Sequence, residues 1–171
     1  MKKLLIVALV AAAAAVLPRG LDAQAAATEQ LTKFMQTLQL DGIQLGCVHL
    51  NDRTVAILFQ PPTLYAMRAR TKEATALYVQ GVAEKDLELD TTNFIIEQPG
   101  APAATSTPTS IHNFTKGNKV KVAKGDRVDG VLTFSRLIDV NKSFILKHGK
   151  AMTEFRLADV VPDMTAPPAP K

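Results

Sequence analysis

The sequence contains a single cysteine, Cys47, so the chain cannot form an internal disulfide. Its stability must therefore come from a hydrophobic core. The chain has 171 residues, and the 146 residues that follow residue 25 are enough for one domain. Such a domain buries roughly 68% of the surface that its unfolded form exposes. Cys47 lies in the stretch 44–48, which has the character of a strand, and we expect it to be buried as a small apolar residue.

The chain also lacks a strong excess of charge of one sign. It has 20 basic and 16 acidic residues, and beyond residue 25 this becomes 17 basic and 15 acidic residues, a net charge of +2. Strong electrostatic attraction to nucleic acid or to a membrane surface is therefore not implied. There is no tryptophan, and no aromatic residue is interleaved with the basic stretch 116–127, so a stacking platform for single strands is absent. We expect no nucleic-acid partner.

The motifs of the common catalytic centres are missing as well. The sequence contains no G-x-S-x-G, no H-E-x-x-H and no glycine-rich loop that opens a helix. Cys47 and a distant histidine formally provide a nucleophile and a base. Cys47, however, is expected in the middle of a strand, which argues against this role. We therefore assign no catalytic residue, no cofactor-binding residue and no metal ligand, and we expect a protein that is not an enzyme. A hydrolase whose site assembles only in three dimensions stays open as an alternative.

The N-terminus has the three parts of a secretory signal peptide. Lys2 and Lys3 form a basic start, residues 4–17 are a continuous apolar run, and Ala23-Gln24-Ala25 places small residues where a signal peptidase cuts. The run of 14 residues is shorter than the roughly 20 residues of a membrane-spanning helix. We predict that residues 1–25 are removed on export, leaving no membrane span, and that the protein works in the periplasm or outside the cell.

The next segment, residues 26–42, is predicted to hold a short N-terminal helix over residues 28–40. Leu31, Phe34, Met35 and Leu38 recur at the spacing of one helix face, and Asp41-Gly42 would end the helix. This helix either packs on the following domain or binds a partner.

From residue 43 the apolar period changes to two, which is typical of β-strands. We predict strands at residues 43–50, 54–60, 64–70, 73–83, 86–90, 92–98, 111–114, 119–122, 124–134, 142–147 and 153–158. The first two would be joined by a hairpin turn at residues 51–53. Many short strands with turn signals at short intervals indicate an antiparallel β-sandwich or barrel, here spanning residues 43–161.

Two segments do not fit this pattern. Residues 99–110 and 162–171 are rich in proline, alanine and threonine and have little apolar surface to bury. We predict a flexible loop for the first and a disordered tail for the second.

The stretch 124–134, KGDRVDGVLTF, carries the clearest strand signal. Gly125-Asp126 forms a turn, and the following residues alternate, with apolar side chains at Val128, Val131 and Phe134. A glycine inside a strand often marks a bulge or a close approach of another backbone, and we expect one of these at Gly130 and a bulge at Gly81.

These elements resemble the extracytoplasmic bacterial Ig-like (telokin-like) β-sandwich domains of unknown function. The resemblance covers roughly residues 64–157. It rests on Asn93-Phe94, Gly125, Val128, Gly130, Val131, Phe134, Phe144-Ile145-Leu146 and Phe155. It implies an Ig-like sandwich in the envelope or outside the cell, and it transfers no catalytic residue. The N-terminal helix with the hairpin after it, and the Pro/Thr-rich segment 99–110, have no place in that pattern.

Two sets of side chains could bind metal ions. Soft and borderline ligands suited to copper occur at His49, His112, His148, Met67, Met152 and Met164, without any short local spacing. A strand with acidic residues on one face, Asp86, Glu88 and Asp90, could hold Ca²⁺ or could form a solvated edge.

One set of side chains could bind an anionic surface. It consists of Lys116, Lys119, Lys121, Lys124 and Arg127. Lipopolysaccharide, teichoic acid or DNA would suit it. A solvated strand edge, where lysine blocks unwanted pairing, explains it as well.

The expected function is a secreted or periplasmic, non-enzymatic binding module whose partner is an unidentified envelope or extracellular protein or polymer. The alternative is a small periplasmic copper-binding protein.

Overall fold

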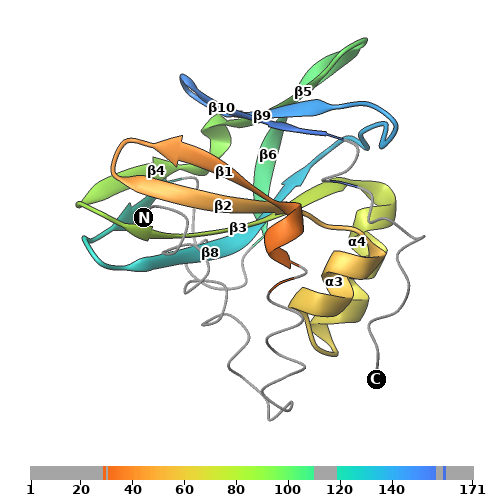
Figure 1. The fold of residues 1–171 in the computed structure, drawn as a ribbon, viewed down its shortest axis with the longest axis horizontal. Coiled ribbons are helices and arrows are strands. Elements are labelled where there is room, and N and C mark those ends of the chain that lie inside the picture. Colours follow the sequence, from red (N-terminus) through yellow and green to blue (C-terminus); the bar gives the residue numbers. More distant parts are fainter. Residues whose placement is uncertain (1–28, 30, 110–118, 157–159, 161–171) are drawn as a thin grey trace.

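The computed structural model describes residues 29, 31–109, 119–156 and 160 (Figure 1). The fold is mainly β, with antiparallel strands and few helices, as the sequence predicts. The strands are β1 (Met35–Leu40), β2 (Ile43–His49), β3 (Thr75–Ala83), β4 (Leu87–Asp90), β5 (Phe94–Gln98), β6 (Ala101–Thr109), β7 (Lys119–Val122), β8 (Arg127–Phe134), β9 (Phe144–His148) and β10 (Ala151–Phe155). The helices are α3 (Asp52–Leu58), α4 (Thr63–Glu73) and a short 3-10 helix at Thr91–Asn93.

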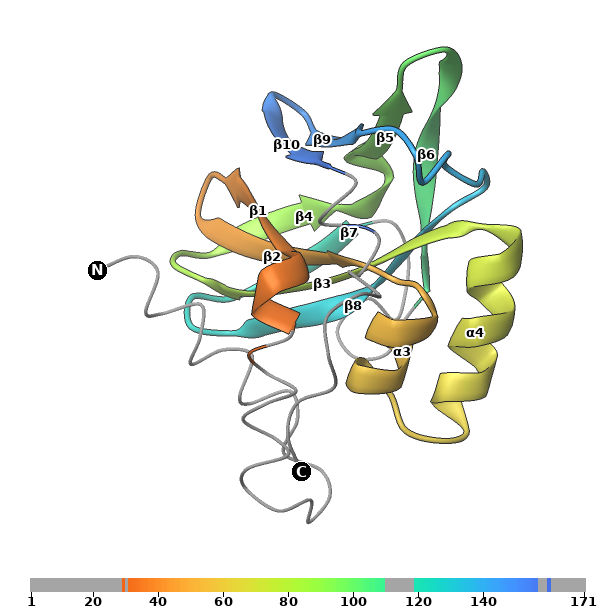
Figure 2. The same cartoon turned by 45° about the vertical axis from the view of Figure 1, so that its right-hand side comes forward.

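Eight strands form one curled sheet in the order β1-β2-β3-β8-β6-β5-β9-β10. The sheet bends so far that its two edge strands, β1 and β10, lie against each other. The ribbon of β4 and β7 forms a separate two-stranded sheet (Figure 2). The curled sheet encloses the main core, in which the largest fully buried side chains include Phe94, Phe134, Phe144 and Phe155.

The sheet is covered on its outer face too, because α3 and α4 pack there (Figure 2). Strand β8 shows the consequence: Val128 and Phe134 face the main core, whereas Val131 lies in the helix-side cluster. The simple alternation expected for this stretch is therefore interrupted, because Val131 lies on the opposite face from Val128 and Phe134. Residues an odd number apart point to opposite faces of a strand, and both faces of β8 are buried.

The predicted bulges do not form. Gly130 pairs with Val79, and Gly81 pairs with both Leu45 and Val128, in unbroken registers. At Gly81 the reason for glycine is space, because a Cβ there would lie 2.6 Å from the backbone oxygen of Gln44.

The predicted N-terminal helix over residues 28–40 is wrong in its second half. Residues 31–34 are helical, but β1 follows at once and pairs with β2 through the turn at Gly42, whose φ is +89°. Leu38 and Leu40 are both buried in the main core, and a spacing of two residues on one face fits a strand and not a helix.

The predicted strands at residues 54–60 and 64–70 are wrong, because these segments form α3 and α4. At Asn51, where a hairpin turn was expected, the side-chain oxygen accepts hydrogen bonds from the backbone N–H groups of Arg53 and Thr54, at 3.0 and 3.1 Å. The Thr54 hydroxyl accepts one in return from the Asn51 N–H, at 2.9 Å. This reciprocal capping box starts a helix in a segment whose β-branched residues, Thr54, Val55 and Ile57, would favour a strand.

Replacing Asn51 by alanine is expected to lower the free energy of unfolding by about 1–2 kcal/mol. The variant loses the cap and also the hydrogen bond from Asn51 Nδ2 to the backbone oxygen of Val160, at 2.7 Å. Urea unfolding followed by circular dichroism measures the change. Asn51→Ser, which keeps a good capping oxygen, should recover most of it. Equal losses in both variants would show that the cap is not what stabilises this position.

The Pro/Thr-rich segment 99–110 was predicted to be a flexible loop, and this is wrong for residues 101–109, which form β6. Its backbone pairs with β5 on one side and with β8 on the other. One partner, β5, immediately precedes β6 in the chain, but the residues paired in the other, β8, lie more than 20 residues further on, so composition alone could not reveal that β6 is enclosed on both sides. The predicted strand at 111–114 and the tail 162–171 lie outside the described residues, as do residues 1–25.

Candidate functional site

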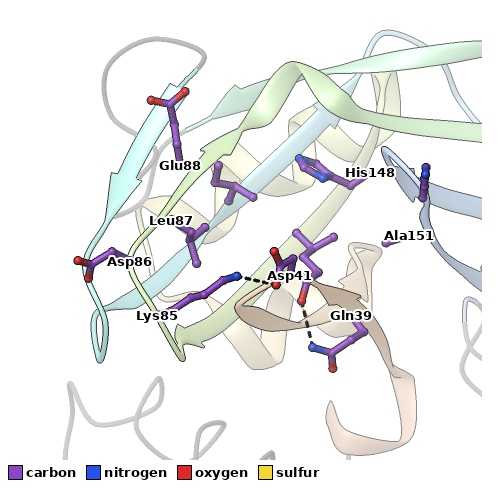
Figure 3. A pocket seen from close by; sticks show the side chains of 11 residues that line it. Gln39, Asp41, Lys85, Asp86, Leu87, Glu88, His148 and Ala151 are labelled. Atoms are coloured by element: carbon purple, nitrogen blue, oxygen red, sulfur yellow. Dashed lines mark hydrogen bonds and ion pairs between the residues drawn. The ribbon is translucent and has the colours of Figure 1, made fainter.

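A hollow of about 700 Å³ opens at one end of the curled sheet (Figure 3). It lies where the β1–β2 turn, the β3–β4 connection and the β9–β10 turn come together. Its polar lining consists of Gln39, Asp41, Lys85, Asp86, Glu88, His148 and Lys150. Its apolar lining consists of Leu40, Leu87, Leu89 and Ala151. These residues are distant in the sequence, and the fold brings them together.

The walls of the hollow are tied to each other. The backbone N–H of Glu84, beyond β3, donates to the oxygen of Gly42 in the β1–β2 turn, at 2.7 Å. Beside it Lys85 Nζ and Asp41 Oδ1 form an ion pair, also at 2.7 Å. Both side chains are largely exposed, so the ion pair adds little stability. Together with the backbone bond it fixes the distance between two of the three walls.

The other two carboxylates of the lining are also engaged. Asp86 Oδ1 accepts a hydrogen bond from the backbone N–H of Lys124 in the β7–β8 turn, at 2.7 Å. Glu88 Oε1 lies 3.4 Å from Lys119 Nζ on the neighbouring strand β7. In Figure 3 both carboxylates point away from the middle of the hollow.

His148, at the end of β9, is held from two sides. Its Nε2 atom lies 3.0 Å from the backbone oxygen of Asp90, and since a carbonyl oxygen only accepts, Nε2 carries the hydrogen. The ring also packs on Phe94, with centroids 4.6 Å apart. Asp90 in turn caps the short helix after β4, and the hydrogen bonds from Thr92 hold the pKa of its carboxyl below the usual value. The imidazole therefore has a fixed orientation at the edge of the hollow.

The structure does not gather the candidate copper ligands. His49 faces the main core beside Phe144. Met67 belongs to α4 and is buried in the helix-side cluster, and Met152 is exposed on β10. His148 lies in the hollow. His112 and Met164 lie outside the described residues. Within the described part of the chain, no three His, Cys, Asp or Glu side chains come close enough to hold a metal ion.

Two residues of the basic stretch, Lys119 and Arg127, form ion pairs with neighbouring carboxylates. Glu88 is paired across the β4–β7 ladder with Lys121 and forms an ion pair with Lys119. Arg127 Nε lies 3.6 Å from Asp129 Oδ1. Lys116 lies outside the described residues. These pairs favour the interpretation of the basic stretch as a solvated strand edge over that of an anion-binding surface.

Cys47 is fully buried, as the sequence analysis predicted. Burial raises the pKa of its thiol to about 12, so the sulfur stays protonated at neutral pH. A protonated, inaccessible thiol cannot act as a nucleophile.

A polar cluster on the outer face of β3 and β8 was missed by the sequence analysis. The Tyr78 hydroxyl lies 3.4 Å from Asp129 Oδ2 and 3.5 Å from Gln80 Oε1, and all three side chains are buried. Burial, and next the charge of Asp129, raise the pKa of Tyr78 to about 12. The signal was present in the sequence, since residues 78 and 80 share one face of their strand. The β3–β8 register sets Gln80 opposite Asp129.

No helix among the described residues combines the length and the apolar character needed to cross a membrane. No family model matches the chain, and neither the curated proteins nor the solved structures give a match. What the chain does must therefore be argued from its own residues.

Proposed function

We propose that this protein is an exported, non-enzymatic binding module that holds its ligand in the hollow at the end of the curled sheet. One observation carries the proposal: three connections from distant parts of the chain form the walls of one hollow. Hydrogen bonds and an ion pair tie two of these walls together without a ligand. A site that is formed before its ligand arrives avoids the entropy cost of ordering.

The distribution of shifted pKa values favours binding over catalysis. Catalytic sites cluster groups whose pKa values are strongly shifted. Here burial is the largest cause of the shift for Cys47, His49 and Tyr78, and none of the three lines the hollow. Each is driven toward its neutral form, which suits a stable interior.

Export to the periplasm or the medium rests on the leader pattern of residues 1–25. Kinship with the Ig-like exported domains rests on the motifs of residues 64–157, and the antiparallel strands support it. Both stay predictions, as does an envelope or extracellular polymer or protein as the source of the ligand.

The test is to fill the hollow. Ala151→Phe adds a ring at the lining, whereas Met152→Phe adds the same ring at the neighbouring, exposed position of β10. A panel of small metabolites and glycan fragments is titrated into the ¹⁵N-labelled chain. We expect at least one compound to shift the amides of residues 39–41, 85–89 and 148–151, and Ala151→Phe to abolish the shift while Met152→Phe keeps it.

Circular dichroism and urea unfolding establish that both variants are folded. A compound whose shifts lie elsewhere, or survive Ala151→Phe, would show that the hollow is not the binding site. Turnover of any compound by the purified protein would contradict the non-enzymatic part of the proposal.

A further inference from the structure

The charged side chains around the hollow differ in whether they have a partner within the protein. Asp41 is paired with Lys85, Asp86 accepts the N–H of Lys124, and Glu88 is paired with Lys119. All three acidic side chains of the lining thus have partners within the protein. Each of these carboxylates therefore already receives a hydrogen bond or an ion pair on one of its oxygens.

Of the two lysines that line the hollow, Lys85 is paired with Asp41, whereas Lys150 is not. Lys150, in the β9–β10 turn, lines the hollow and makes no hydrogen bond or ion pair within the described part of the chain. On the same hairpin, His148 uses Nε2 for the oxygen of Asp90. Lys150 is therefore the charged side chain of the lining that has no partner among the described residues.

The apolar part of the lining lies next to these groups. Ala151 follows Lys150 directly in the chain, and Leu87 lies on β4; both are only partly buried and pack against the main core. They offer exposed apolar surface that a ligand could cover, at about 25 cal/mol per Å² removed from water.

We infer that the hollow takes an amphipathic anion, with its apolar body against Leu87 and Ala151 and its carboxylate or phosphate headgroup at Lys150. This inference rests on the proposed function. The two headgroups share the chemistry that Lys150 recognises, so the probes must tell them apart.

The probes are four compounds with the same ten-carbon chain, each used below its critical micelle concentration: decanoate, decyl phosphate, decanol and decyltrimethylammonium. Binding is followed by the amide shifts of residues 148–151 in the full chain. We expect decanoate or decyl phosphate, or both, to bind more tightly than decanol, and raising the NaCl concentration from 0.05 to 0.5 M to weaken only the anions.

Lys150→Met removes the charge and keeps the aliphatic stem. It should weaken anion binding about two- to fivefold, as expected for a solvent-exposed ion contact, and leave decanol unchanged. The matched control is Lys72→Met on α4, another exposed lysine that does not line the hollow, and it should change nothing.

If decanol or the cation binds as tightly as the anions, and Ala151→Phe blocks it, the inference of an anion is overturned while the proposed function stands. Anion binding that survives Lys150→Met unchanged also overturns the inference. If none of the four probes and no member of the wider panel shifts these amides, both the inference and the proposed function fail.

Discussion

Replacement of Phe144 by alanine is expected to lower the free energy of unfolding by about 3–5 kcal/mol. Phe144 is fully buried at the start of β9, and its ring stacks on Phe155 of β10 with centroids 4.6 Å apart and planes inclined by 5°. On its other side it meets His49 of β2 edge-on, at 6.1 Å. The ring thus joins three strands across the curled sheet, and its removal leaves a cavity between them.

Urea unfolding at pH 7, followed by circular dichroism, measures this loss. Tyr65→Ala is the matched control, because it removes another aromatic ring that is 64% exposed on α4, and we expect a change within about 0.5 kcal/mol. Phe144→Leu keeps most of the volume and should cost clearly less than the alanine variant. A loss below about 1.5 kcal/mol for Phe144→Ala would mean that the core can collapse around the site and that the ring stack contributes little.

A fall from pH 7 to pH 4 is expected to remove about 3 kcal/mol of stability through His49 alone. His49 ends β2 and points into the main core, where its Nδ1 atom is buried without a hydrogen-bond partner. Burial lowers its pKa from 6.5 to about 4. A buried imidazole resists protonation, because the charge would lose its hydration.

The sign of the effect follows from the two pKa values. Above pH 6.5 the imidazole is neutral in both the folded and the unfolded chain, so the full stability is present. Between pH 6.5 and about 4 the unfolded chain binds a proton that the folded chain does not, and unfolding becomes easier by about 1.4 kcal/mol per pH unit. Below about pH 4 this contribution is constant. The lowered pKa values of Asp90 and Asp139 act only below their ordinary value of 3.8, outside this window.

The measurement compares urea unfolding at pH 7, 5.5 and 4.5 for the natural protein, His49→Leu and His49→Gln. Neither variant titrates at residue 49, so both should lose less stability on acidification than the natural protein does. The leucine variant should also be the more stable of the two at pH 7, because it buries no unpaired polar atom. Parallel pH curves for all three proteins would show that His49 is already accessible to protons in the folded state.

The elements that could be predicted from the sequence are those whose local signal agrees with their final surroundings. Strand β4 alternates cleanly, with Leu89 buried and Glu88 exposed. The turn before β8 takes its shape from Gly125, whose φ is +87°, as its sequence suggests. In both cases the residues needed for the prediction lie within one short window.

Where prediction failed, a distant contact or an overlooked cap decided the structure. Strand β6 is rich in proline and threonine, yet its backbone is held between β5 and β8. Helix α3 has a β-branched sequence, and the exchange of hydrogen bonds between Asn51 and Thr54 sets its start. That cap could have been recognised from Asn51 and Thr54 at a spacing of three, whereas the pairing of β6 could not.

The candidate site shows the same division. From the sequence, His148 was one of several scattered soft ligands, and nothing marked Lys150 as a binding residue. Only the curling of the sheet, which brings the β9–β10 turn to the β1–β2 turn and to β4, places these two neighbouring residues beside Asp41 and Leu87 in one hollow.

The sequence by itself determined that this is a mainly β protein with a disulfide-free core, because a period of two and a cysteine count are local properties of a chain. The tertiary structure alone decided which face each strand buries, which segments become helices, and which charges are left without partners. These depend on residues brought together over long sequence distances, and the free energy of such contacts is not encoded in any single window of the chain.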